Sequence, residues 1–479
     1  MKKLLSMLAF AVMVTFVACD DDDEATPDGP SITTPAVTSV QVATSADVTF
    51  ALTVPGGYKS MTVTATGGTA TKKTEPTAGQ TSGNAVVTYT ADGTAGAGTV
   101  VITVTDNNGK VESETAALNK TAEVVEETVI DVTANITQNT TWETGKTYIL
   151  TTRIAVVNGV TLTIEPGVIV KGEAGTGPNA TALIIARGGK LMAEGTAEAP
   201  IIFTSVADEI EPGEIASPNL DPELNGLWGG LIVLGKAPIS ADAEAVQIEG
   251  IPPSDQNGLY GGTEPADNSG ILKFISIRHG GANIGEGNEI NGLTLGGVGS
   301  STVIENIEVV ANQDDGIEWF GGTVNVTNAI VWNAGDDAID TDQSWAGTLD
   351  NFIVINPGDE AFELDGPEGV LEAGHTLING WVSAGAAEGL VDLDDNSITV
   401  MENIYFTNIT AGQDFDLNPD DCTFANFQAT LPNGTVLTDF FKDGSDAFVT
   451  SVAAGANTVG ADFTKFAGWS WAAVNGELD

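Results

Sequence analysis

Short apolar runs rich in valine, isoleucine and leucine, separated by glycine and asparagine, fill the chain from about residue 131 to residue 479. They have no helical period, and runs of this length and composition predict β-strands. One residue type recurs in register, because successive asparagines are 22, 23, 28 and 24 residues apart at Asn306, Asn328, Asn351, Asn379 and Asn403. Repeats of this length are typical of solenoids. The pattern therefore predicts a coil of stacked parallel strands over residues 131–479.

Each repeat alternates apolar and acidic residues. Two apolar columns are expected to face the core: Ile317, Ile339, Phe362, Val391 and Phe415, and then Trp319, Thr341, Leu364, Leu393 and Leu417. The residues between and after them form two outer columns: Glu318, Asp340, Glu363, Asp392 and Asp416, and Phe320, Asp342, Asp365, Asp394 and Asn418. Nine residues after the first four asparagines come Asp315, Asp337, Glu360 and Glu388. Equivalent residues of parallel strands stack at ~4.8 Å, so the sequence predicts a ladder of carboxylates about 19 Å tall.

A different alternation occupies residues 36–121, where polar and apolar residues alternate strictly, as in Val48-Thr-Phe50-Ala-Leu52-Thr-Val54. Such alternation predicts half-buried antiparallel strands. Turn signals at Pro55-Gly56-Gly57 and Asn107-Asn108-Gly109 recur at strand-length spacing, which suits a small sandwich. The segment resembles bacterial immunoglobulin-like spacer domains. A carbohydrate-binding sandwich is the alternative, but no cluster of aromatic residues supports it. Residues 122–130 are expected to form a linker.

The first residues resemble an export signal. Met1-Lys2-Lys3, an apolar stretch to Val17 and Ala18 predict a signal peptide over residues 1–18, too short to span a bilayer. The end of this stretch, Phe16-Val17-Ala18-Cys19, resembles the lipobox of lipoproteins, which implies a membrane anchor through lipid on Cys19. Residues 19–35 begin with an acidic run that is expected to be a solvated tether. That run resembles the surface-export signal of Bacteroidota-type lipoproteins, whereas an Asp directly after the cysteine resembles an inner-membrane retention signal.

Several segments resemble one bacterial family of β-helix lipoproteins. They are Gly159–Val168, Trp228–Pro238, Glu289–Gly299, Asp314–Gly322 and Phe466–Trp471. The resemblance covers about residues 131–479 and implies an all-β protein with a right-handed parallel β-helix preceded by the small immunoglobulin-like sandwich. It also favours an outer-membrane, cell-surface location. Some members of the family lie beside TonB-dependent receptors, which implies a role in nutrient capture.

The charge of the chain restricts its partners. There are 66 Asp+Glu against 17 Lys+Arg, a formal net charge of -49, which disfavours nucleic acid and favours cations. Between His279 and Phe441 there is no Lys or Arg, so the carboxylate ladder has no basic partner from its own stretch. Only Cys19 and Cys422 are cysteines, which leaves no intramolecular disulfide once Cys19 carries lipid.

Calcium is the cation that fits the ladder best, because it takes 6 to 8 oxygen ligands with loose geometry. Transition metals prefer softer ligands, and His279 and His375 are the only histidines. Asn312, Asn333 and Asn356 could add oxygens. The predicted ligands are Asp314, Asp315, Glu318, Asp336, Asp337, Asp340, Asp342, Asp359, Glu363, Asp365, Asp392 and Asp394. The competing interpretation is a face of solvated acids that only keeps the protein soluble.

A glycoside hydrolase is the enzymatic alternative. Gly335-Asp336-Asp337 resembles part of the pectin hydrolase signature, and the candidate catalytic carboxylates are Asp336, Asp337, Asp340 and Glu363. The Gly-His-Gly and Arg-x-Lys elements of that signature are missing. A polysaccharide lyase is less favoured still, because the stretch has no Lys or Arg to abstract a proton.

We therefore expect a surface lipoprotein with a calcium-binding β-helix that binds a glycan, a cation or a partner protein. Trp345, beside a turn glycine, is the candidate for stacking on a sugar, whereas Trp319 falls in an inward column. A hydrolase, and a structural or adhesive surface protein, remain as alternatives.

Overall fold

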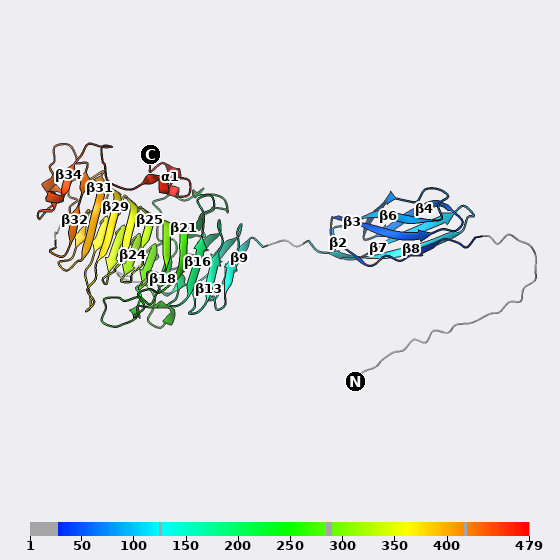
Figure 1. Cartoon of the computed structure of the whole chain (residues 1–479), viewed down its shortest axis with the longest axis horizontal. Helices are drawn as coiled ribbons and strands as arrows, with labels where there is room; N and C mark the ends of the chain where they lie inside the picture. The colour runs from blue at the N-terminus through cyan, green and yellow to red at the C-terminus, as the bar shows by residue number, and fades with distance from the viewer. Residues whose placement is uncertain (1–26, 124–126, 284–289, 416–418, 479) are drawn as a thin grey trace, which may run out of the picture. The chain divides into compact units, whose positions relative to one another are not determined.

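The computed structural model describes residues 27–123, 127–283, 290–415 and 419–478 (Figure 1). The chain divides into two compact units, residues 1–126 and 127–479. The predicted signal peptide, residues 1–18, and the predicted lipidation site Cys19 lie outside the described residues. Within the described ranges, no helix is long and apolar enough to cross a membrane.

The first unit contains two four-stranded sheets that share one core. One sheet has the order β1 (Ser31–Thr33), β3 (Ser45–Thr53), β6 (Ser82–Ala91), β5 (Gly68–Thr74). The other has the order β2 (Thr38–Gln41), β8 (Val111–Thr121), β7 (Gly96–Asp106), β4 (Tyr58–Thr66). The predicted start at residue 36 is wrong, because β1 precedes it and pairs with β3. Part of the expected tether therefore belongs to a sheet.

The second unit is a parallel β-helix (Figure 1). Its smaller sheet contains β12 (Ile154–Val156), β15 (Leu183–Ile185), β18 (Leu231–Leu234), β22 (Leu293–Gly296), β24 (Ile317–Phe320), β26 (Ile339–Asp342), β28 (Phe362–Leu364) and β30 (Asp392–Leu393), in that order. Every neighbouring pair in this sheet is parallel. This confirms the all-β, parallel-helix prediction.

The larger sheet has sixteen strands among the described residues. They are β9 (Val129–Val132), β10 (Thr140–Trp142), β11 (Thr147–Leu150), β13 (Thr161–Ile164), β14 (Ile169–Gly172), β16 (Lys190–Glu194), β17 (Ile201–Ser205), β21 (Gly270–Arg278), β23 (Val303–Val310), β25 (Val326–Trp332), β27 (Thr348–Ile355), β29 (His375–Ser383), β31 (Thr399–Thr407), β32 (Thr423–Ala425), β33 (Phe427–Ala429) and β34 (Val449–Ser451). The predicted linker 122–130 is too long, because β9 begins inside it and pairs with β11.

The recurring asparagines bend the long strands of this sheet. All five have a positive φ. It is 59° at Asn328 and between 60° and 63° at Asn306, Asn351, Asn379 and Asn403. Asparagine is one of the few residues other than glycine that adopts this conformation readily. The side-chain amides also stack, with Asn328 Nδ2 donating to Asn306 Oδ1 at 2.9 Å and Asn351 Nδ2 to Asn328 Oδ1 at 2.7 Å. The repeat seen in the sequence is therefore the bend that closes each coil.

The predicted register of the smaller sheet is the observed one. Glu318 pairs with Asp340, Asp340 with Glu363, and Glu363 with Asp392. The inward residues on either side, such as Ile317 and Trp319, are fully buried in the core. Residues Asp416, Leu417 and Asn418 of the predicted columns lie outside the described residues.

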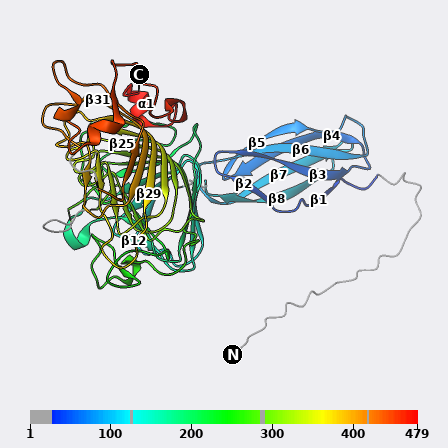
Figure 2. The same ribbon diagram turned by 60° about the vertical axis from the view of Figure 1, so that its left-hand side comes forward.

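Two segments cover the outside of the coil. Residues 235–269 form an insertion that contains β19 (Val246–Gln247), η2 (Gln256–Gly258) and β20 (Leu259–Tyr260), and its side chains pack on the outer face of the smaller sheet. The C-terminal segment, with η5 (Phe463–Lys465) and α1 (Trp471–Asn475), lies outside the larger sheet (Figure 2). Three further short 3-10 helices are η1 (Gly177–Asn179), η3 (Leu437–Asp439) and η4 (Ser445–Phe448).

Candidate functional site

The outer face of the smaller sheet changes from apolar to acidic along the coil. One column begins with Ala155, Ile184 and Ile232. It continues through Thr294 to Glu318 and then through the acids above it. We call the twelve predicted ligands the acidic face. It occupies the strands from β24 to β30 and the residues directly before and after them.

Burial of the acidic face decreases along the same direction. Glu318, Asp340, Asp315 and Asp337 are only 4%, 6%, 7% and 4% exposed. Asp342, at the end of β26, is half-buried, as are Asp359, Glu363 and Asp365 of the next rung, and Asp392 and Asp394 are exposed. A carboxylate without a partner is costly only where water is excluded, so the buried acids define the part of the face that needs an explanation.

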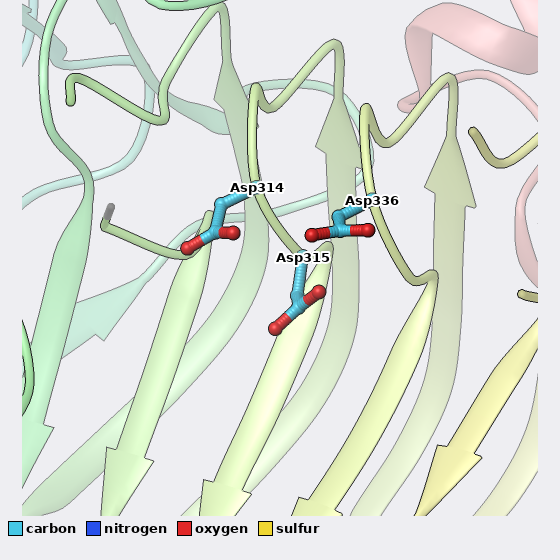
Figure 3. Close-up of side chains that lie close together, drawn as sticks. All are labelled: Asp314, Asp315 and Asp336. Atoms are coloured by element: carbon cyan, nitrogen blue, oxygen red, sulfur yellow. The ribbon is translucent and has the colours of Figure 1, made fainter. Parts of the chain in front are cut away.

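Five acids of this face form two overlapping clusters, of which only the second is wholly buried. Asp314, Asp315 and Asp336 lie near the starts of neighbouring strands (Figure 3). Asp315 also belongs to a second cluster with Glu318 and Asp340. In each cluster one carboxylate oxygen per residue lies within 4.8 Å of the others, a spacing that one cation could bridge. Asp315 is common to both, so it lies between the two candidate positions.

Two of these acids also hold the backbone of the next coil. Asp315 Oδ1 accepts a hydrogen bond from the amide N–H of Asp337 at 3.1 Å. Asp337 Oδ1 accepts one from the N–H of Glu360 at 2.7 Å. The nine-residue register is therefore partly structural, since each acid caps the turn of the following repeat. One oxygen of each carboxylate remains for another role.

No basic side chain of the described residues pairs with the second cluster. Across the described ranges, the ion pairs of the coil involve other carboxylates, and none includes Asp315, Glu318 or Asp340. The contact of Glu318 is with Asn291, whose Nδ2 donates to Glu318 Oε2. Asn291 is itself only 3% exposed, and its Oδ1 has no hydrogen-bond partner among the described residues. A buried amide, and no charged donor, therefore contacts the carboxylates of this cluster.

Burial and mutual repulsion raise the pKa of the acids on this face. Burial first, and then the charge of Asp340, raises the pKa of Asp315 and of Glu318 well above the ordinary range. Burial and the charge of Asp365 raise the pKa of Asp342 to about 8, and burial and Asp394 raise that of Asp365 to about 7. The carboxyls of Glu318 and Asp340 lie within hydrogen-bonding reach of each other. Without a cation, these acids would hold protons that ordinary carboxyls have lost.

The donor set determines which cation would fit. It consists of carboxylate oxygens, and hard oxygen ligands in an irregular array suit calcium. The amide of Asn291 contacts this set by donating from Nδ2 to Glu318 Oε2. Asn291 precedes β22 as Asp315 precedes β24. Sequence reasoning missed it, although the same repeat register would have found it.

The asparagines predicted as extra ligands have other contacts. Asn356 Nδ2 donates to Asn333 Oδ1 at 2.9 Å, and both residues have a positive φ, so they form a second bend ladder. Asn312 Nδ2 donates to the carbonyls of Ile290 and Asp315. The side-chain oxygens of Asn333 and Asn356 are thus engaged in hydrogen bonds of the bends and turns. Asn312 Oδ1 is buried and has no hydrogen-bond partner among the described residues, so a ligand role of Asn312 stays a prediction.

One pair of the candidate catalytic carboxylates is too close for an inverting mechanism. Asp337 and Glu363 lie within hydrogen-bonding reach of each other. An inverting hydrolase keeps its two carboxyls about 6.5 to 9.5 Å apart to admit a water. Asp340 is buried against Glu318, and Asp336 belongs to the first cluster. The four residues therefore divide between different contacts.

The prediction that Trp345 stacks on a ligand is wrong. Its side chain is fully buried, and its ring stacks on Trp319 at 4.6 Å and on His375 at 5.2 Å between ring centroids. Its Nε1 donates to the carbonyl of Val324 at 2.9 Å. The turn glycine beside it suggested exposure, but the ring points into the coil. His279 is buried too, with Nδ1 against the carbonyl of Leu224, as expected of a structural histidine.

Comparison with known proteins places the coil in a family. Two solved structures are similar over most of their length. They are the family 28 exopolygalacturonase of Yersinia enterocolitica (10% identity, 88% of this chain and 90% of that chain, TM-score 0.24) and the catalytic unit of a thermostable GH87 α-1,3-glucanase from Streptomyces thermodiastaticus strain HF3-3 (13%, 92% and 97%, TM-score 0.25). No curated protein matches the chain. The family model described as a pectate-lyase-like β-helix domain matches residues 134–439, so the chain belongs to the pectate-lyase-like β-helix family.

Proposed function

We propose that this protein is an exported, lipid-anchored β-helix protein that binds calcium on its acidic face and uses the bound ion to hold a ligand at the cell surface. The observation that carries the calcium proposal is the cluster of Asp315, Glu318 and Asp340. All three are less than 10% exposed, their oxygens lie within 4.8 Å of each other, and no basic side chain of the described ranges pairs with them.

Two physical states can relieve this cluster. The acids can share protons, as their raised pKa values indicate for the cation-free protein. Alternatively, a divalent cation can replace those protons and let all three ionise. Asn291 Nδ2 donates to Glu318 Oε2, and a donor to a carboxylate favours its ionised form, which supports the cation.

A melting experiment distinguishes the two states. All eight tryptophans lie at or after Trp142, so tryptophan fluorescence reports unfolding of the β-helix and not of the sandwich. At neutral pH, calcium at one hundred times its dissociation constant should stabilise the folded coil by about 2.7 kcal/mol over the chelated protein. A melting temperature that is the same in calcium and in chelator would sink the proposal.

Two variants make this experiment specific. Asp340→Asn removes one charge from the cluster and keeps its shape, so it should raise the melting temperature in chelator and lose the response to calcium. Glu402→Gln changes an exposed acid of β31 outside the acidic face and should respond like the unchanged protein. An equal calcium response in all three proteins would place the ion elsewhere.

The anchor is proposed from Cys19 and the acidic run after it. Incorporation of a labelled fatty acid in the producing cell, lost in Cys19→Ser, tests it. Protease accessibility on intact cells then tests display at the cell surface. The held ligand is proposed to be a glycan or a partner protein, with a TonB-dependent receptor as the partner to seek by co-purification.

The hydrolase alternative can be tested only by measuring enzymatic activity. It is supported by membership of a family named for a polysaccharide-cleaving enzyme, but the contact between Asp337 and Glu363 does not favour it. Release of new reducing ends from a glycan panel, abolished in Asp337→Asn, would replace the binding role with catalysis.

A further inference from the structure

A second site lies away from the acidic face, at the other end of the smaller sheet. A cavity of about 420 Å³ opens beside the turns that follow β12, β15 and β18. Asn158, Arg187 and Lys236 come from these three turns, and the facing wall comes from the insertion through Gln256, Asn257 and Thr263. The volume suits a single small molecule rather than a polymer.

The walls of this cavity are fixed by contacts that do not involve a ligand. Asp255, which caps η2, lies 3.5 Å from the guanidinium of Arg153. Gln247 Nε2 donates to three carbonyls of the loop that leads to η2. The apolar side chains of the insertion are buried on the outer face of β15 and β18. The insertion is therefore held in place, and the cavity is formed before any ligand arrives.

Two cations in the cavity lack a counter-ion. Arg187 donates from NH1 to the carbonyl of Gly261 at 2.9 Å, which leaves the rest of its guanidinium for other contacts, and it forms no ion pair with a described residue. The same holds for Lys236, which is half-buried. A chain with 66 acidic residues would readily provide partners, and five other basic side chains of this unit have one.

A glycine lets the Lys236 side chain approach the turn that carries Arg187. A Cβ at Gly188, where φ is +87°, would come within 3.2 Å of Lys236 Cε and 2.3 Å of Asn158 Oδ1. The lysine chain therefore lies against the backbone of the residue next to Arg187. Two like charges that line one cavity repel each other, and an anion bound by both removes that repulsion.

The acids of the cavity limit the charge of the ligand. Glu244 and Glu264 also line it, and both are exposed. Neither forms an ion pair with a described basic residue, and their charges repel a ligand that carries several negative charges. Amides on both walls offer donors and acceptors for hydroxyl groups.

We infer that this cavity binds a small monocarboxylate that carries hydroxyl groups, with its carboxylate between Arg187 and Lys236 and its hydroxyls on the amides of Asn158, Gln256 and Asn257. The planar guanidinium suits a carboxylate, and the ammonium adds a second charge-assisted hydrogen bond. The site shares no residue with the acidic face. Its failure would leave the calcium proposal unchanged.

Calorimetric titration of the whole protein with D-gluconate tests this inference, with D-glucitol as the neutral compound of matched shape, in buffer without added calcium. Gluconate should bind with a measurable Kd, and glucitol should bind at least about tenfold more weakly. Equal binding of the two, or no heat from gluconate at about 10 mM, would overturn the inference. Tighter binding of inorganic phosphate would overturn it as well, in favour of an oxyanion site.

Matched lysine variants locate the binding. Lys236→Gln should weaken gluconate binding at least about tenfold and leave binding of glucitol unchanged. Lys190→Gln alters an exposed lysine of β16 that does not line the cavity, and it should bind gluconate like the unchanged protein. The melting temperature of each variant shows that the coil is intact. Equal weakening by both substitutions would mean a general charge effect and would contradict the proposed site.

Discussion

The two halves of one sheet face use the same backbone for opposite chemistry. In the first half, Ala155, Ile184 and Ile232 stack in a column beneath the side chains of the insertion. In the second half, the same column continues as acids in unbroken parallel register. The comparison shows that the coil fixes where a side chain stands and not what it does. Function is decided by which side chain occupies each rung.

The boundary between the halves is where the two chemistries conflict. Burial extends one or two rungs beyond the last apolar residue of the column. Glu318 and Asp340 are nearly as buried as the residues on the preceding rungs. Burial of an apolar side chain stabilises the fold by about 1.5 to 3 kcal/mol, whereas burial of an unpaired charge costs several. A bound cation turns this unfavourable boundary into a site.

The largest effect on stability is expected when an acid is placed in the apolar half of the face. Ile232→Asp places a carboxylate in the apolar half, where Ile232 is only 1% exposed and packs among apolar side chains of the sheet and the insertion. It should lower the free energy of unfolding of the coil by about 3 to 5 kcal/mol. Urea unfolding followed by tryptophan fluorescence measures this. A loss below about 1 kcal/mol would mean that the apolar half tolerates a carboxylate, and it would contradict the difference drawn between the two halves.

A smaller effect is expected from pH. The pKa of Asp342 is about 8 and that of Asp365 about 7 in the folded, cation-free protein, whereas an unfolded Asp titrates near 4. Between these values only the folded state holds the protons, so a rise in pH lowers the free energy of unfolding. We expect a loss of about 1 to 2 kcal/mol from pH 5 to pH 8 in chelator, since solvent screens these half-buried groups.

Calcium should alter that pH dependence. Acids that bind the ion are ionised in the folded state, so saturating calcium should abolish or reverse the loss between about pH 5 and pH 8. The sign of the slope in the two buffers is the measurement. A chelated protein whose stability rises with pH over this range would contradict the raised pKa values of the acidic half.

The smallest effect is expected at the exposed end of the ladder. Asp394 lies at the surface, where water screens its neighbours. Asp394→Asn should change the free energy of unfolding by less than about 0.5 kcal/mol, with or without calcium. A large effect there would show that the far rungs also bind ions, and the acidic half would then be one extended site.

The fold was largely predictable because a single recurring residue marks each repeat. The asparagine column fixed the register, since a bend at positive φ accepts few other residues. The same register correctly stacked Glu318, Asp340, Glu363 and Asp392. The sandwich and coil limits were off by a few residues, because a short edge strand such as β1 depends on its partner and not on its own pattern.

The candidate site was less predictable, because burial depends on distant segments. The sequence does not reveal that the insertion covers the first rungs. The burial of the neighbouring acids could therefore not be predicted from their own repeat. The prediction that Trp345 is exposed was wrong for the same reason, because its neighbours Trp319 and His375 are 26 and 30 residues away in the chain. Asn291 was recognisable only after the role of Asp315 was known.

The most direct test of the account is a calorimetric titration of the chelated protein with calcium, compared with Glu318→Gln and with the control Glu402→Gln. The account predicts saturable binding in the unchanged protein and the control, and a Kd at least about tenfold weaker in Glu318→Gln. Binding that is absent from the unchanged protein, or equally tight in all three, would contradict a calcium site between Asp315, Glu318 and Asp340.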